Sequence, residues 1–280
     1  MEKSGIALFA ILSAIIWGTS FPITKMGLQH ISPITFAFLR YSLASLLFFL
    51  ALVFSPPENI RGMNMKKIFL LGLTGVTLPT LLQNFGLNYT SAYLTGFIQS
   101  TGPIYTVILA HLFLKERINA YKILGVIIAI TGVYFMIRPQ GGGNFYGNML
   151  ILLSAISYSI GGIVAKDLLN EGHKPMHVIS ISSIAGTLLL FPLIFMERIS
   201  VDVEGIKYIA FLALFTTFMA YILWYKAMEK MEVSKLSFFT YLIPIFSIIS
   251  SHFFLREYMK IGTIFAGFIA VIGMAIAQKA

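Results

Sequence analysis

Few side chains with chemistry of their own lie inside the long apolar blocks of this sequence, and Arg40 is the one charged residue well inside such a block. An arginine near the middle of a membrane helix costs about 2.5–3.5 kcal/mol on insertion scales, so it must snorkel to the interface, pair with an acid or bind a ligand. We expect Arg40 to contact Glu257 and help to close an outer gate, with Glu116 in the corresponding inner gate. The alternative is a snorkelling or purely structural arginine.

Amide and hydroxyl side chains form the second group of candidates. Thr77 and Asn84 share one helix face by their spacing, and Gln99 lies on a polar face of the next part of the chain. An amide in lipid needs a partner or a water-filled space, so we expect Asn84 and Gln99 to line a cavity. For hydroxyl residues such as Thr77, helix–helix packing is an equal alternative.

Aromatic and hydroxyl residues of other apolar blocks complete the predicted substrate-binding set. They are Trp17, Tyr158, Tyr225, Thr240 and Tyr241. Aromatic side chains also fill the interiors of helix bundles or form belts at membrane interfaces, so packing is the alternative role for the aromatic members.

The residue types that are missing narrow the chemistry. No Asp or Glu lies in the middle of an apolar block, so the carboxylate relay of sodium or proton coupling is missing. His111 and His252 could titrate, but we interpret them as interface residues. No Lys or Arg is expected at the midplane, where a phosphate-bearing cargo would require a cation. We therefore expect a small neutral or zwitterionic cargo with an aromatic or apolar part.

The sequence offers little for catalysis. An enzyme within the membrane would need paired carboxylates, a His/Asp cluster or a nucleophile with its base. His173 and His177 have metal-like spacing, but no third ligand is evident. We expect no enzymatic activity, no metal and no cofactor. A small cargo that crosses the membrane implies a transporter. A lipid scramblase or channel-like protein is the alternative function, and an enzyme that acts on lipids is a less favoured alternative.

Composition indicates the elements that must position these residues. The chain has 280 residues, of which 58% are hydrophobic and 11% charged, whereas soluble domains carry about 25% charged residues. Apolar blocks of about 18 residues or more predict membrane-spanning helices. The predicted fold is an all-α polytopic membrane protein with ten transmembrane helices. We place them at 5–25, 33–54, 66–87, 92–114, 120–138, 147–167, 176–196, 205–226, 233–254 and 260–278.

The chain repeats itself at a shift of 141 positions. HLFLKE at 111–116 corresponds to HFFLRE at 252–257, Lys25 to Lys166 and Pro103 to Pro244. This predicts two homologous halves, 1–140 and 141–280, within a single membrane domain. Five spans per half is an odd number, so the second half must be inverted relative to the first. Inverted repeats are a transporter architecture with the substrate near the midplane.

Charge indicates orientation and partners. The net charge of +9 reflects Lys and Arg in loops, which favours a plasma-membrane protein with both termini in the cytoplasm. The expected partners are a small-molecule substrate and the lipid bilayer, not nucleic acid. Glycines such as Gly125 and Gly273 in the fifth and tenth spans would permit close contacts within or between chains, so a homodimer stays open.

Several segments resemble the EamA-type branch of the drug/metabolite transporter superfamily, and the resemblance covers the whole chain. The segments are AIIWGTSFPITK with Trp17-Gly18, then Ser91-Ala92, Pro103-Ile104, Leu114 to Glu116, Pro244-Ile245 and Leu255 to Glu257. The second half departs from the first, with Tyr158-Ser159 in place of Trp17-Gly18 and no arginine matching Arg40. The resemblance implies a ten-helix exporter or exchanger with a central cavity. We therefore predict a secondary transporter that works by alternating access.

Overall fold

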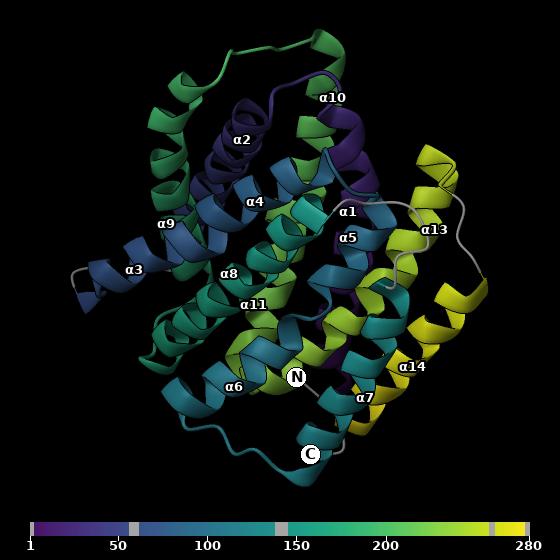
Figure 1. Ribbon diagram of the computed structural model, residues 1–280. Coiled ribbons are helices and arrows are strands. Elements are labelled where there is room, and N and C mark those ends of the chain that lie inside the picture. The colour runs from purple at the N-terminus through teal and green to yellow at the C-terminus, as the bar shows by residue number, and fades with distance from the viewer. Residues whose placement is uncertain (1–2, 56–61, 138–144, 258–260, 278–280) are drawn as a thin grey trace.

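The computed structural model describes residues 3–55, 62–137, 145–257 and 261–277, which form a bundle of helices (Figure 1). Eight helical segments in these residues are long and apolar enough to cross a membrane. They are α1 (Lys3–Gly27), α2 (Pro33–Val53), α3 (Met65–Gly72) with α4 (Leu78–Leu87), α5 (Ala92–Gln99) with α6 (Gly102–Leu114), α8 (Phe145–Asn170), α9 (Pro175–Leu190) with a short 3₁₀ extension, α10 (Val203–Phe211) with α11 (Ala220–Lys230), and α12 (Val233–Ser237) with α13 (Ile243–Leu255). The prediction of an all-helical membrane protein is confirmed at this level.

Two further apolar helices are shorter than these segments. They are α7 (Ala120–Ile137) and α14 (Ile261–Ala277), which pack against each other along one edge of the bundle (Figure 1). A Cβ at Gly125 would lie 2.6 Å from the carbonyl oxygen of Gly273, and the reverse distance is the same. Both glycines therefore serve the close approach of two helices within one chain, which is one of the two roles expected for them.

Four of the membrane-crossing segments are not regular α-helices. A π-helical turn at Leu73–Thr77 joins α3 to α4, and another at Leu212–Met219 joins α10 to α11. The segment of α5 and α6 is interrupted before Gly102, and a 3₁₀ turn at Phe238–Leu242 joins α12 to α13. The two π-helical turns lie about 141 positions apart in the sequence, and so do the breaks in α5–α6 and α12–α13. This separation matches the shift that relates the repeated sequence motifs. Such departures from α-helical geometry are frequent at functional sites.

The breaks in α5–α6 and in α12–α13 fall beside two prolines that correspond to each other under the repeat shift. Pro103 and Pro244 occupy the first turn of α6 and of α13. Proline is tolerated there, because the amide hydrogen that it lacks would have no partner within the helix. The prolines therefore begin a new helix rather than bend a continuous one.

The two halves of the chain are interlocked. Helix α1 packs against α11 and α13, while α8, the first helix of the second half, packs against α4 and α6. Helix α2 packs against α9, and α7 packs against α14, so these contacts also join the two halves. Large apolar side chains such as Phe49, Phe113 and Phe253 are exposed on the outside, as expected of surfaces in contact with lipid. The interior between the halves contains both apolar clusters and buried polar side chains.

Candidate functional site: a cavity between the two halves

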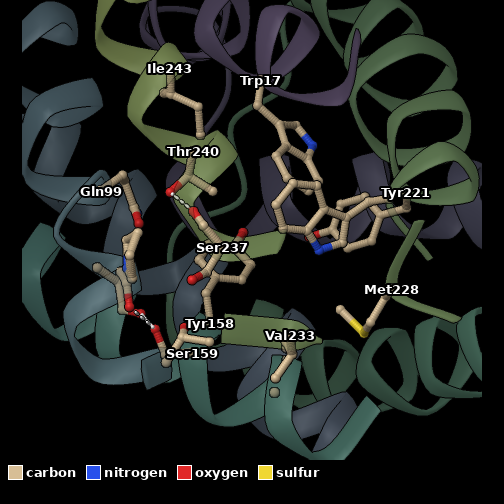
Figure 2. A pocket seen from close by; sticks show the side chains of 18 of the residues that line it. Trp17, Gln99, Tyr158, Ser159, Tyr221, Met228, Val233, Ser237, Thr240 and Ile243 are labelled. Atoms are coloured by element: carbon tan, nitrogen blue, oxygen red, sulfur yellow. Dashed lines mark hydrogen bonds between the residues drawn. The ribbon is translucent and has the colours of Figure 1, made fainter. Parts of the chain in front are cut away.

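A cavity of about 160 Å³ lies inside the bundle, lined by residues of both halves of the chain. A single buried water needs only about 10–15 Å³ of such space, so the cavity is large enough for a small organic molecule. Figure 2 shows its walls from close by: the side chains of Trp17 and Tyr221 approach from one side, Gln99 and Ser159 from the other, and Tyr158 lies between them.

One wall of the cavity is aromatic. The ring centroids of Trp17 and Trp224 are 4.8 Å apart, and those of Trp17 and Tyr221 are 5.5 Å apart in an edge-on arrangement. The indole Nε1 of Trp17 donates a hydrogen bond of 3.0 Å to the carbonyl oxygen of Thr216, which lies in the π-helical turn before α11. Tyr221, Trp224 and Tyr225 follow the spacing of one helix face. The wall is therefore built by α1 and α11 and fixed by a backbone bond.

The opposite wall is polar. The amide nitrogen of Gln99 donates to Gln83 Oε1 at 3.3 Å and to the hydroxyl of Ser154 at 2.9 Å. The Ser154 hydroxyl donates in turn to the carbonyl oxygen of Pro79 at 2.8 Å. Thr240 lines the same cavity, and its hydroxyl donates to the carbonyl oxygen of Ser237. These bonds hold amide and hydroxyl groups at the cavity surface without using all of their donors and acceptors.

Five of the eight predicted substrate-binding residues line this cavity: Trp17, Gln99, Tyr158, Tyr225 and Thr240. The structure therefore brings together residues from α1, α5, α8, α11 and the α12–α13 break.

The other three residues, Thr77, Asn84 and Tyr241, do not belong to the lining of this cavity. The Thr77 hydroxyl donates to the carbonyl oxygen of Gly186 in α9, and the Asn84 amide donates to that of Pro33 at the start of α2. Tyr241 is fully buried in the packing against α14. Polarity alone does not distinguish a side chain that faces a cavity from one that bonds the backbone of a neighbouring helix.

The predicted substrate-binding set did not include Gln83 or Trp224, although the repeat shift contained the signal for both. Position 83 corresponds to position 224 under the shift of 141, just as Trp17 corresponds to Tyr158 and Gln99 to Thr240. All of these residues line the cavity. On the segment α3–α4, the other residues that line the cavity are Leu71 and Gly75, and neither has a polar side chain. The pattern of polar residues therefore did not indicate which face of this segment lines the cavity.

Arg40 also lines the cavity, where its partners differ from the expected one. Its side chain is buried, its Nε donates to Thr217 Oγ1 at 2.9 Å, and its Nη2 donates to Thr216 Oγ1 at 3.0 Å. The predicted contact with Glu257 is therefore wrong in this structure. No cation was expected at the midplane of the cavity, yet α2 directs Arg40 into the cavity lining rather than toward the interface.

Glu257 and Glu116 have matching roles at opposite ends of the bundle. The Glu257 carboxylate accepts hydrogen bonds from the backbone amides of Ala92 and Tyr93, at 3.2 and 3.3 Å, and pairs with Lys25 at 3.0 Å. The Glu116 carboxylate accepts from the amides of Val233 and Ser234 at 2.8 and 3.1 Å. Each glutamate therefore caps the first turn of a helix, α5 or α12, that belongs to the other half.

The backbone just before each glutamate explains why it points at its partner helix. Lys115 and Arg256, which end α6 and α13, adopt left-handed conformations with φ of 57° and 53°. This conformation terminates a helix and turns the following residue aside. It is unfavourable for a residue with a Cβ, yet it occurs at both equivalent positions and turns both glutamates away from their own helices. We call the two arrangements the α5 cap and the α12 cap.

One surface cluster in the described part of the chain has the geometry of metal ligands. It consists of His30, Asp202 and Glu204. His30 Nδ1 lies 2.9 Å from Asp202 Oδ2, and this hydrogen bond lowers the pKa of Asp202 below its usual value. Glu204 pairs with Lys207. The cluster is exposed and its carboxylates already have partners, so it serves to join the loop after α1 to the start of α10.

A helical membrane bundle with an interior cavity at the junction of two similar halves is the architecture of a membrane transporter. The sequence profile of the EamA-like transporter family matches residues 4–138 and again residues 145–277. The chain therefore belongs to the EamA-like transporter family. This membership makes the protein a transporter rather than an enzyme, and it agrees with the resemblance seen in the sequence motifs.

Two relatives and one solved structure illustrate the similarity. The chain is 31% identical over 270 residues to an uncharacterized transporter of Archaeoglobus fulgidus, covering 96% of each chain. It is 29% identical to the uncharacterized transporter YetK of Bacillus subtilis, covering 92% of this chain and 82% of YetK. A crystal structure with 15% identity superimposes with a TM-score of 0.79, covering 99% of this chain and 98% of that one, and it shows the shared fold.

Proposed function

We propose that the protein is a secondary transporter that moves a small amphipathic metabolite, neutral or zwitterionic, across the plasma membrane by alternating access, as an exporter or exchanger. The observation that carries this proposal is the cavity with an aromatic wall facing a polar wall. Small-molecule sites are usually such concave, mostly apolar surfaces with a few placed polar groups. An aromatic or aliphatic body would pack against Trp17 and Trp224 while its polar end faces Gln83 and Gln99.

The proposed topology has ten spans in two inverted halves, with both termini in the cytoplasm. At about 1.5 Å per residue, the 18 residues of α7 and the 17 of α14 extend about 25–27 Å, close to the ~30 Å of a bilayer core. Their mutual packing supports an assignment of α7 and α14 as the fifth and tenth spans. With five spans in each half, the caps at Glu116 and Glu257 lie on opposite faces of the membrane.

This arrangement supports alternating access. The helices that line the cavity, α5–α6 and α12–α13, are broken near Gly102 and Ile243, close to the cavity wall. The short segments α5 and α12 are tied at their far ends by the caps from the other half. Release of one cap would let its short segment move about the break and open one side, while the other cap keeps the opposite side closed. Such local rearrangement about a fixed site is typical of transporters with repeated halves.

The test is uptake into proteoliposomes with labelled neutral and aromatic amino acids beside a sugar phosphate. Gln83→Ala/Gln99→Ala is compared with Gln29→Ala, which removes an exposed amide outside the cavity. We expect saturable uptake of at least one amphipathic compound and a KM raised about 5–30-fold in the double variant only, because each lost hydrogen bond is worth about 1 kcal/mol. Flux that does not saturate would favour the channel or scramblase alternative.

A further inference from the structure

Arg40 is a buried cation without an acidic partner. Among the residues that the structure describes, no carboxylate forms an ion pair with it, and its hydrogen bonds go to two neutral threonine hydroxyls. The carboxylates of the same region have other partners. Glu257 accepts a hydrogen bond from the backbone of α5 and pairs with Lys25, and Glu197 accepts hydrogen bonds from the first backbone amides of α2. A buried charge is expensive unless a counter-charge compensates it, and most strongly so in a membrane.

The hydrogen bonds of the guanidinium leave one side of it open. Nε and Nη2 form one edge of the planar group, and this edge is held by Thr217 and Thr216. Within the described residues, Nη1 donates to no protein acceptor, so the edge formed by Nη1 and the second hydrogen of Nη2 remains available. This edge has the geometry that binds a carboxylate through two parallel hydrogen bonds. Arg40 belongs to the cavity lining, so a ligand in the cavity can reach it.

The two threonines make Arg40 a rigid part of the aromatic wall. Thr216 contributes its hydroxyl to Arg40 Nη2 and its carbonyl oxygen to Trp17 Nε1. The same residue therefore fixes both the cation and the indole, within the π-helical turn Leu212–Met219. A ligand with a carboxylate and an adjacent apolar body would meet both groups at once. Preorganised groups of this kind lose little conformational freedom on binding.

The geometry points to Arg40 as the anchor for a carboxylate group of the cargo. This inference rests on the proposed transport function and redefines its cargo as one that carries a carboxylate and an apolar or aromatic body. A zwitterion stays within the proposed class, an organic acid is added to it, and a neutral molecule or a simple amine is removed from it. The cargo carboxylate supplies the counter-charge that none of the described residues provides to Arg40.

The chain contains its own reporter for this interaction. Both of its tryptophans, Trp17 and Trp224, line the cavity. Binding of a ligand that does not absorb at the excitation wavelength is therefore followed by tryptophan fluorescence of the purified protein. Four probes share one aromatic body and differ in the polar end: phenylacetate, phenylalanine, phenylacetamide and phenethylamine.

In wild-type protein, phenylacetate and phenylalanine should bind at least about tenfold tighter than phenylacetamide, and phenethylamine more weakly still. Arg40→Gln should reduce the preference for acid over amide to about twofold or less. The matched control Arg198→Gln, which removes an exposed arginine outside the cavity, should retain it. Arg40→Lys, which keeps the charge but loses the planar fork, should show an intermediate preference.

Equal binding of acid and amide to wild-type protein would overturn the inference, as would absence of acid binding or an unchanged preference in Arg40→Gln. The wild-type comparison decides alone if Arg40→Gln fails to fold. The outcome is separate from that of the transport proposal. Saturable uptake of an amide or amine without acid preference would reject the role of Arg40 and retain transport. Acid-selective binding without any flux would retain the role of Arg40 and reject transport.

Discussion

The α12 cap allows a quantitative prediction about gating, because one carboxylate joins the halves at this face. Glu116 accepts hydrogen bonds from the amides of Val233 and Ser234 and from the Ser234 hydroxyl, and only 10% of its side chain is exposed. Lys122, with 2% exposed, bonds Ser234 and Glu232 beside it. A glutamine at position 116 retains one acceptor oxygen and loses both the second acceptor and the negative charge.

The size of the effect follows from what is lost. A helix cap is worth about 0.5–2 kcal/mol, and a negative charge at a helix N-terminus adds about 0.3–1 kcal/mol. Glu116→Gln loses part of the cap energy and all of the charge contribution, so we estimate that the capped state of α12 is destabilised by about 1–2 kcal/mol. Since 1.4 kcal/mol is a factor of ten, the equilibrium between the capped and released α12 should shift about 5–30-fold toward release.

The assay uses the absence of cysteine from the chain. A single cysteine at Ser237, which lines the cavity at the end of α12, is labelled with a membrane-impermeant maleimide from the side where α12 begins. Glu116→Gln should raise the labelling rate about 5–30-fold. The matched control Glu229→Gln removes a half-exposed carboxylate near the same end and should leave the rate unchanged. An unchanged rate in folded Glu116→Gln, or an equal rise in Glu229→Gln, would refute the reasoning.

Three further predictions address the other cap, the packing and the aromatic wall. Glu257→Gln should raise the rate of maleimide labelling from the side where α5 begins. Raising the salt concentration from about 0.1 to 1 M should speed labelling more on this side than on the side where α12 begins, because Lys25 is 29% exposed and its charge is screened more readily than that of Lys122. Gly161→Ala should lower the stability of the protein in detergent by about 1–3 kcal/mol, measured as a lower melting temperature, because its Cβ would lie 2.7 Å from the backbone of α3–α4. Gly162→Ala, with open space around it, should be neutral. Trp17→Phe should raise KM for an aromatic cargo several-fold at constant protein abundance, and an unchanged KM would remove Trp17 from the site.

The membrane architecture was readable from the sequence because lipid imposes one strong requirement. Every spanning segment needs about 20 apolar residues, and such blocks are visible without knowledge of their neighbours. Pro103 and Pro244 mark local restrictions of the backbone that are visible in the sequence, although the sequence did not show that each begins a new helix. The equivalence of Glu116 and Glu257 followed from their positions in the repeated motif, although their role as caps for the opposite half did not.

The direction in which a polar side chain points was much less predictable. Asn84 and Gln83 are adjacent amides, yet Asn84 bonds the backbone at Pro33 while Gln83 faces the cavity. The π-helical turn at Leu73–Thr77 adds a residue to one turn and rotates everything after it, and nothing in the local sequence announces that turn. Arg40 likewise could snorkel or turn inward, and its direction depends on hydroxyls from α10–α11, far away in the chain.

The cavity also shows how two similar halves can bind a cargo that has two different ends. Trp17 and Tyr158 stand at equivalent positions of the repeat, and both are aromatic residues of the cavity lining. At the next equivalent pair the halves differ: the first supplies Gln83 where the second supplies Trp224. If both halves had kept the same residue, the walls would be alike and would suit a symmetric ligand. The divergence at this pair gives one half an amide and the other an indole in the cavity lining, and Arg40, which has no counterpart in the second half, adds a cation. The proposed amphipathic carboxylate would therefore bind in one orientation.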